Sequence, residues 1–172
     1  MGIDPADARA FPGFAQLDDR SIDDLRARMR PVRLRPGETL FHRGERNASL
    51  YLLFRGDVDI VETDGERAVA TRRARTVIGE LGLLLDVPRT ATVVAATDVL
   101  CWEITQQAFS AAIDRGEPWA ARLALAVATE LAARFVDVRG ELTRLDTTTN
   151  GPAHRPAELE QLRTRLLAEW AF

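Results

Sequence analysis

The alternation of hydrophobic and polar residues changes period along this chain. Residues 18–29 carry apolar side chains at helical spacing, and Ser21 followed by Asp24 resembles a capping box, so we expect a short helix that ends before Pro31. From residue 32 to residue 105 the pattern becomes short runs rich in β-branched and aromatic residues, separated by glycine or aspartate. The expected strands are 32–42, 49–56, 57–64, 66–73, 90–96 and 98–105. Asp64-Gly65 predicts a two-residue hairpin turn between two of them.

The C-terminal third returns to a helical period. Thr105 is a plausible N-cap for a helix over 106–114, and Pro118 suits the first turn of a longer helix that runs to residue 145. The apolar stripe of this helix is Trp119, Leu123, Val127, Leu131, Phe135, Val138, Leu142 and Leu145. From Leu131 the stripe has heptad spacing, which favours pairing with a second copy of the helix. Packing of one long helix on its own barrel is the alternative.

Residues 147–156 (TTTNGPAHRP) collect the usual helix breakers and predict a linker. An amphipathic helix is expected after it, with Leu159, Leu162, Leu166 and Trp170 on one side. The chain therefore divides into an N-terminal helical segment (1–31), a β-roll core (32–105), C-terminal helices (106–145), and a linker with a tail helix (146–172).

Composition narrows the class of protein. The 172 residues are 46% hydrophobic and 28% charged, which suffices for a buried core, and no apolar run approaches the ~20 residues of a membrane span. One cysteine, Cys101, excludes an internal disulfide framework or a cysteine metal cluster. We expect a cytoplasmic protein. The net charge of −3, with arginine supplying every basic side chain, does not favour a nucleic-acid-binding face.

The stretch IGELGLLLDVPRTATVVA (78–95) combines one acid, one base and two glycines in apolar surroundings. Gly79 and Gly82 permit a turn whose free N–H groups can form an anion nest. The planar fork of Arg89 suits a phosphate, and an ionised Glu80 suits a sugar hydroxyl. These residue types are compatible with a ligand that carries both groups. A structural Glu–Arg pair that closes a loop fits the spacing equally well.

The same stretch resembles the phosphate-binding cassette of the cyclic nucleotide-binding domain. The cassette pattern reads here as Ile78-Gly79-Glu80-Leu81-Gly82-Leu83, four variable residues, then Pro88-Arg89-Thr90-Ala91. Upstream, Gly37-Glu38, Leu40-Phe41-His42-Arg43-Gly44-Glu45 and Leu50-Tyr51-Leu52-Leu53-Phe54-Arg55-Gly56-Asp57-Val58 resemble a second signature of the family. The resemblance covers roughly residues 12–145.

The resemblance implies a fold and a ligand. The fold is mainly β with flanking helices, a double-stranded β-helix or jelly-roll barrel of eight strands followed by a long C-terminal helix. Glu80 would accept from the ribose 2′-OH, Arg89 would pair with the cyclic phosphate, the amides of Gly82 and Thr90 would also reach the phosphate, and Gly79 and Leu81 would shape the turn. The purine would meet the long helix, where Thr129, Arg134 and Phe135 are the candidate caps. Cyclic AMP is preferred over cyclic GMP, although Thr90 is compatible with either.

The family's bacterial regulators follow the long helix with a winged helix-turn-helix, and the 27 residues after Leu145 are too few for one. We therefore expect no DNA binding by this chain, no membrane span, no catalysis, no metal and no cofactor other than the cyclic nucleotide. His42 and His154 have no partners at metal-ligand spacing. The expected partners are a second copy through the 118–145 helix and an unidentified protein effector or fused domain. Three interpretations stay open: a stand-alone sensor, a regulatory domain of a larger or truncated protein, and a scaffold that has lost its ligand.

Overall fold

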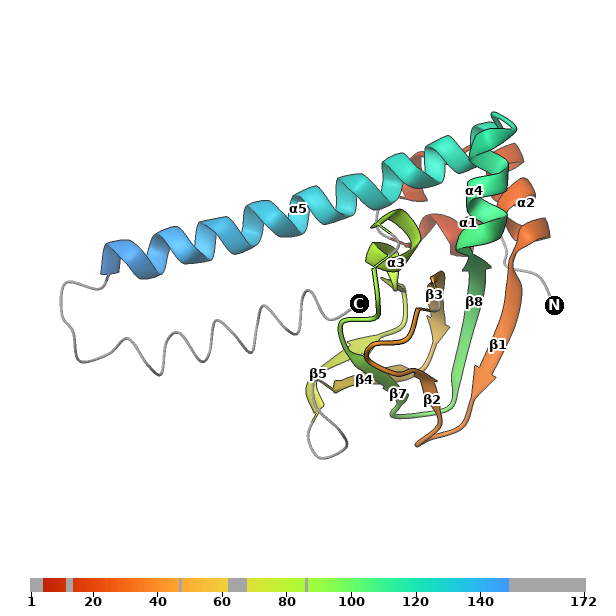
Figure 1. Ribbon diagram of the computed structural model, residues 1–172. Coiled ribbons are helices and arrows are strands. Elements are labelled where there is room, and N and C mark those ends of the chain that lie inside the picture. Colours follow the sequence, from red (N-terminus) through yellow and green to blue (C-terminus); the bar gives the residue numbers. More distant parts are fainter. Residues whose placement is uncertain (1–4, 12–13, 47, 62–67, 86, 149–172) are drawn as a thin grey trace.

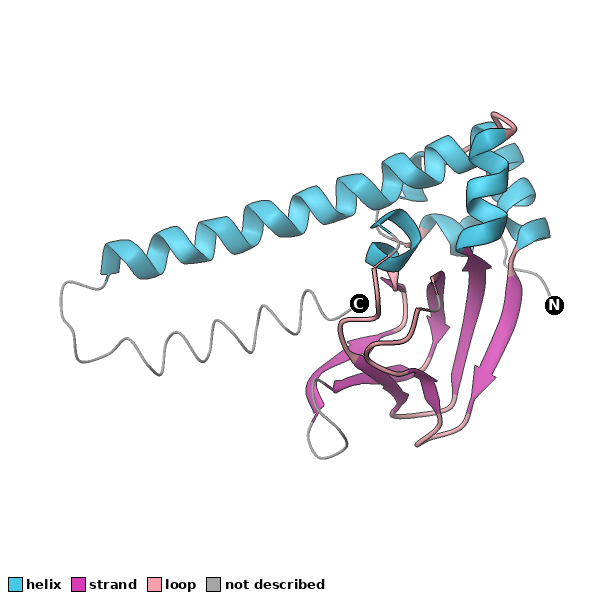
Figure 2. Ribbon diagram, viewed as in Figure 1, coloured by secondary structure: helices cyan, strands magenta, loops and turns pink. Residues whose placement is uncertain are grey.

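The computed structural model describes residues 5–11, 14–46, 48–61, 68–85 and 87–148 of the chain. A β-barrel carries helices at one end, and the last helix extends well beyond the barrel (Figure 1). Helices and strands segregate along the molecule, as the colours of Figure 2 show. The predicted fold, a mainly β jelly-roll barrel with flanking helices and a long C-terminal helix, is confirmed.

Eight strands in the described residues form two four-stranded antiparallel sheets. The strands are β1 (Arg30–Leu34), β2 (Thr39–Phe41), β3 (Ser49–Arg55), β4 (Asp57–Val61), β5 (Ala68–Arg73), β6 (Thr76–Ile78), β7 (Thr92–Ala95) and β8 (Val99–Thr105). The first sheet has the order β1-β8-β3-β6 and the second the order β2-β7-β4-β5. In the first sheet, β8 pairs with both β1 and β3, so strands that are far apart in the sequence are neighbours in the barrel.

Alternate residues of β3 and β8 in the first sheet belong to two different hydrophobic cores. Tyr51, Leu53 and Cys101 face the barrel interior and join a cluster that includes Val58 and Val93 from the second sheet. The intervening residues of β3 and β8 face outward and pack against the helices. That outer core includes Leu50, Leu52, Trp102, Ile104, Phe109, Trp119 and Leu123. Strand β3 is therefore buried on both faces, which explains its almost continuous apolar sequence.

The helices of the described chain are α1 (Pro5–Arg9), the 3₁₀ helix η1 (Phe14–Gln16), α2 (Asp19–Arg28), α3 (Glu80–Leu85), α4 (Gln106–Asp114) and α5 (Pro118–Thr148). Thr105 caps α4, because its hydroxyl accepts a 3.2 Å hydrogen bond from the amide of Ala108, as predicted. Helix α5 starts at Pro118, also as predicted. None of the described helices combines the length and apolar character that a membrane crossing requires.

The predicted cap of the first helix is wrong. The N-cap of α2 is Asp18, whose carboxylate accepts a 2.8 Å hydrogen bond from the amide of Ser21, so Ser21 lies in the first turn of the helix. Arg122 on α5 hydrogen-bonds both the Asp18 carboxylate and the Ser21 hydroxyl. This contact, made 101 residues away in sequence, ties α2 to α5.

Element boundaries differ from the prediction in three places. The run 32–42 divides into β1 and β2, which belong to different sheets, and β1 already begins at Arg30. Strand β6 was not predicted, since only three residues pair with β3 before Gly79. Helix α5 continues past residue 145 to Thr148. Strands β4 and β5 pair antiparallel, as the hairpin requires, while its Asp64-Gly65 turn and the predicted tail helix at 157–172 lie outside the described residues.

The apolar stripe of α5 has two parts. Trp119, Leu123 and Val127 are buried against the barrel and its helices. Leu125, on another face of these turns, is 66% exposed. Farther along, Phe135 is 57% exposed and Val136, on a different face, is 66% exposed. The first turns of α5 thus pack on their own domain, as the alternative interpretation holds, and the later described turns leave apolar side chains uncovered.

Candidate functional site

The segment between β6 and β7 forms a turn, the short helix α3 and a loop that returns to the barrel. Gly79, between β6 and α3, has a φ of +85°. A Cβ atom at this position would lie 2.4 Å from Nη1 of Arg89 and 2.5 Å from the carbonyl oxygen of Ser49. Both the conformation and the space therefore require glycine.

Arg89 is the centre of the site. Its main chain is clamped, because its amide donates to the carbonyl of Glu45 (2.9 Å) and its carbonyl accepts from the amide of Gly44 (2.8 Å). Its side chain is only 2% exposed. Nη2 donates to the carbonyl of Ser49 (2.7 Å), and Nη1 donates to the carbonyl of Gly79 (3.3 Å).

Aromatic rings form one wall around the Arg89 guanidinium. Its carbon Cζ lies 4.1 Å from the ring centroid of Phe41 and 5.7 Å from that of Tyr51. The two rings are stacked, with centroids 5.9 Å apart. Cation–π attraction of this kind offsets part of the loss of hydration on burial.

The electrostatics of Arg89 suit an anion. Arg89 takes part in none of the ion pairs among the described residues, and its Nε is buried without a hydrogen-bond partner. Burial lowers the pKa of Arg89, against the opposing effects of Tyr51 and Glu45. Because burial still lowers this pKa, the neighbouring groups compensate the buried cation only in part. A phosphate would supply both the missing acceptor and the opposite charge.

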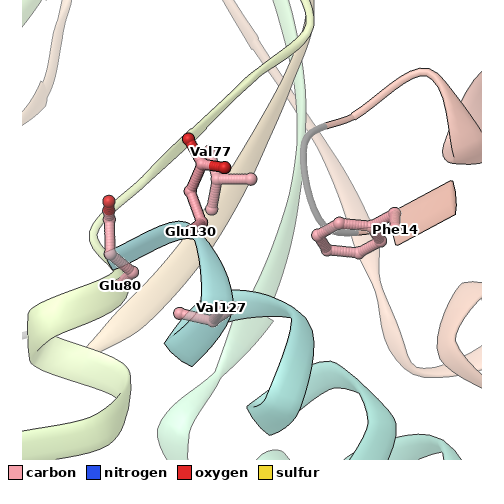
Figure 3. A pocket seen from close by; sticks show the side chains of 5 residues that line it. All are labelled: Phe14, Val77, Glu80, Val127 and Glu130. Atoms are coloured by element: carbon pink, nitrogen blue, oxygen red, sulfur yellow. The ribbon is translucent and has the colours of Figure 1, made fainter. Parts of the chain in front are cut away.

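Glu80 lies on the other side of the same turn. It is the first residue of α3, is 1% exposed, and lines a small pocket with Phe14, Val77, Val127 and Glu130. Figure 3 shows Val127 and Glu130 of α5 across this pocket from Glu80. Helix α5 therefore closes over the carboxylate in this structure.

The remaining predicted residues are placed as follows. Gly82 is buried, and a Cβ there would lie 3.1 Å from Nη1 of Arg89, so Gly79, Gly82 and Arg89 converge on one point. Leu81 is half-buried and Thr90 is exposed beside Arg89.

Two of the three candidate purine caps are exposed on α5. Thr129 is exposed and its hydroxyl donates to the carbonyl of Leu125 (2.8 Å), and Phe135 is exposed as well. The side chain of Arg134 lies outside the described residues. The residues of α5 that face the pocket beside Glu80 are Val127 and Glu130.

Sequence reasoning missed Ser49, Phe41 and Tyr51 as parts of the site. Ser49 acts through its main-chain carbonyl, which carries no residue-specific signal. Phe41 and Tyr51 lie in the runs 32–42 and 49–56, which predicted strands, and nothing in those runs indicated that the two rings flank Arg89.

Two other residues with reactive side chains have ordinary surroundings. Cys101 is buried inside the barrel, where burial raises the pKa of its thiol to about 12. His42 is exposed and its main-chain amide donates to Glu45. Among the described residues, no three histidine, cysteine, aspartate or glutamate side chains lie together in a way that could hold a metal ion.

Comparison with known proteins identifies the class. Residues 31–115 match the family model of the cyclic nucleotide-binding domain. The crystal structure of the N-terminal domain of a transcriptional regulator from Streptomyces coelicolor A3(2) is similar, with a TM-score of 0.64 and 32% identity, over 77% of this chain and 94% of that one. The chain belongs to the cyclic nucleotide-binding domain family, and its domain is of the regulatory type.

Two further relatives show the range of proteins that contain such a domain. Acetyltransferase Pat of Mycolicibacterium smegmatis is 34% identical over 106 residues, which are 60% of this chain and 32% of that protein. The regulatory domain of Toxoplasma gondii PKA, solved with cAMP, matches with a TM-score of 0.56 and 27% identity, over 62% of this chain and 42% of that one. The chain spans about a third or less of the curated relatives it matches.

Proposed function

We propose that this domain is a sensor that binds a cyclic nucleotide, with cyclic AMP preferred over cyclic GMP. The observation that carries the proposal is Arg89, a buried cation with no ion pair in the described chain, set against Gly79 and Gly82. The structure of a relative solved with cAMP supports the preference for that nucleotide. Thr90, an exposed residue, is compatible with both purines.

Each predicted residue has a role in this proposal. Arg89 pairs with the cyclic phosphate, which also receives the amides of Gly82 and Thr90. Glu80 accepts from the ribose 2′-OH, and Gly79 and Leu81 shape the turn. Thr129, Arg134 and Phe135 remain proposed purine caps, which a movement of α5 would bring to the ligand.

Signal transmission follows from the position of α5. Val127 and Glu130 close the pocket on Glu80, so a sugar that binds this carboxylate displaces them. Ligand binding then shifts an existing equilibrium of α5. The C-terminal helices pass the change to a fused domain or to a protein partner. The chain itself performs no catalysis, carries no further cofactor and does not bind DNA in this proposal, and a cytoplasmic location is part of it.

The uncovered apolar residues of α5 support a homodimer through the 118–145 helix. Phe135 and Val136 are exposed on the later described turns of the helix, beyond the turns that pack on the domain. A second copy of the helix would cover such residues and relieve their contact with water.

Calorimetric titration of cyclic AMP and cyclic GMP tests the binding proposal. The wild type is expected to bind with micromolar or tighter affinity, about −8 kcal/mol. Arg89→Ala should weaken binding at least about 100-fold, because it removes charge-assisted hydrogen bonds of about 1.5–3 kcal/mol each. Arg89→Lys keeps the charge but lacks the planar fork of donors, so its affinity should lie between those of the wild type and Arg89→Ala. Arg33→Ala, an exposed arginine of β1, is the matched control and should bind as the wild type does. A folded wild type that binds neither nucleotide at millimolar concentration contradicts the proposal.

A further inference from the structure

A carboxylate outside the predicted site, Glu103, lies in the barrel wall close to the cassette. The register of the first sheet places Arg30, Glu103, Tyr51 and Ile78 directly opposite one another on β1, β8, β3 and β6. Residues opposite each other in a sheet share a face, so this row points its side chains to one side. Its last member, Ile78, immediately precedes Gly79.

Glu103 is 5% exposed and fully engaged. Its Oε1 accepts from the hydroxyl of Ser49 (2.7 Å) and from that of Tyr51 (3.3 Å), and its Oε2 accepts from Nε of Arg30 (2.6 Å). Burial opposes ionisation of Glu103, but the hydrogen bonds from Arg30 and Ser49 outweigh it and the pKa is lowered. Burial first, and Glu103 second, raises the pKa of Tyr51 to about 12, so the phenol keeps its proton as a donor.

The two hydroxyl residues that Glu103 holds are the same two that contact Arg89 from β3. The main-chain carbonyl of Ser49 accepts from Nη2 of Arg89, and the ring of Tyr51 lies beside its guanidinium. Thus one carboxylate restrains both residues by their side chains, while their carbonyl and ring orient the arginine.

We propose that Glu103 is a positioning residue of the anion site, which sets the orientation of the Arg89 guanidinium through Ser49 and Tyr51. Three donors on a buried carboxylate make it a rigid anchor, since moving it would leave an unpaired charge in the barrel. The side chain of Arg30, which is 67% exposed, supplies the compensating charge from the surface. The effect of Glu103 on ligand affinity rests on the proposed function, whereas its effect on Arg89 in the ligand-free protein does not.

The test compares Glu103→Ala, Glu103→Gln and Ser49→Ala with the wild type and with the double variant Glu103→Ala/Ser49→Ala. The first readout is the NMR signal of the Arg89 Nε–H group in the ligand-free protein, assigned by its loss in Arg89→Lys. The second is the affinity for cyclic AMP. Ile22→Ala, in α2 and buried in the outer core, is a control that lowers stability and leaves both readouts unchanged.

We expect Glu103→Ala to shift or broaden the Arg89 Nε–H signal and to weaken cyclic AMP binding about tenfold, the scale of one hydrogen bond to a charged group. Glu103→Gln keeps an acceptor oxygen for both hydroxyls and should recover affinity to within about threefold of the wild type. In the Ser49→Ala background, Glu103→Ala should weaken cyclic AMP binding less than it does alone, because part of the effect of Glu103 on Arg89 passes through Ser49.

The proposal is overturned if Glu103→Ala leaves the Arg89 signal unchanged in a folded protein. It is also overturned if the effects of Glu103→Ala and Ser49→Ala on the free energy of cyclic AMP binding are additive in the double variant. The same holds if Glu103→Gln weakens binding as much as Glu103→Ala does. A wild type that binds no cyclic nucleotide would contradict the proposed function, and the Arg89 signal of the ligand-free variants would still decide the role of Glu103.

Discussion

Nη2 of Arg89 donates a 2.7 Å hydrogen bond to the main-chain carbonyl of Ser49, which lies 40 residues earlier in the chain. The bond joins the loop after α3 to the first residue of β3. It passes beside Gly79, whose missing side chain leaves room for the guanidinium. The geometry of the anion site therefore depends on a contact between segments that are adjacent only in the folded barrel.

Substitution of Gly79 by alanine should destabilise the domain more than the same change at Gly37. Both glycines have a positive φ, of +85° and +86°, so alanine strains the backbone at each by about 1 kcal/mol. At Gly79 the new Cβ also meets Arg89 and Ser49 at 2.5 Å or less, whereas nothing lies within 4 Å at Gly37. We expect Gly79→Ala to lower the free energy of unfolding by at least about 1 kcal/mol more than Gly37→Ala. Urea denaturation measures both, and equal losses would contradict the crowding argument.

Two leucines of α5 lie on opposite sides of the same turns, one on the face that packs on the domain and one on the face that is exposed. Leu123 is fully buried and Leu125 is 66% exposed. Leu123→Ala should reduce the free energy of unfolding by about 2–5 kcal/mol, because it leaves a cavity between α5 and the outer core. Leu125→Ala should change it by less than about 0.5 kcal/mol. Thermal and urea unfolding of the two variants provide the measurement, and a similar loss in both would mean that α5 is not docked as described.

Asp18 makes the domain sensitive to acid. Hydrogen bonds from Ser21, followed by Arg122, lower the pKa of Asp18 from 3.8 to about 2. A carboxyl with a depressed folded pKa stabilises the protein above its unfolded pKa, and that contribution is lost as pH falls from about 4 towards 2. The wild type should therefore lose its advantage in melting temperature over Asp18→Asn across this window. Melting curves of both proteins between pH 5 and pH 2 test this, and a constant difference would be evidence against the coupling.

A charge on the uncovered part of α5 should break the proposed dimer. Phe135 belongs to the heptad stripe and is 57% exposed, so a dimer through this stripe would bury it against the second copy. Phe135→Glu should convert a dimer to a monomer in sedimentation velocity, because an unpaired carboxylate is costly to bury. Ala96→Glu, at an exposed loop position, is the control for added charge and should stay dimeric. A wild type that is monomeric at high micromolar concentration rules the dimer out.

The features that could be predicted from the sequence are those set by local chemistry. Thr105 and Pro118 mark helix starts because a side-chain hydroxyl and a fixed φ act within one turn. Gly79 and Arg89 could be identified because an anion site needs a tight turn and a planar cation, and the two residues lie ten positions apart in one short stretch. The short apolar run 49–56, which ends at Gly56, likewise predicted a strand.

The tertiary structure decided what depends on distant pairing. Arg122 on α5 hydrogen-bonds both Asp18, the cap of α2, and Ser21 in its first turn, a contact across more than 100 residues of sequence. Ser49, Tyr51 and Glu103 meet only through the β3–β8 register, with 52 to 54 residues between the partners. Side-chain patterns within a window of the sequence carry no information on such contacts, because the register between strands depends on how the whole barrel closes.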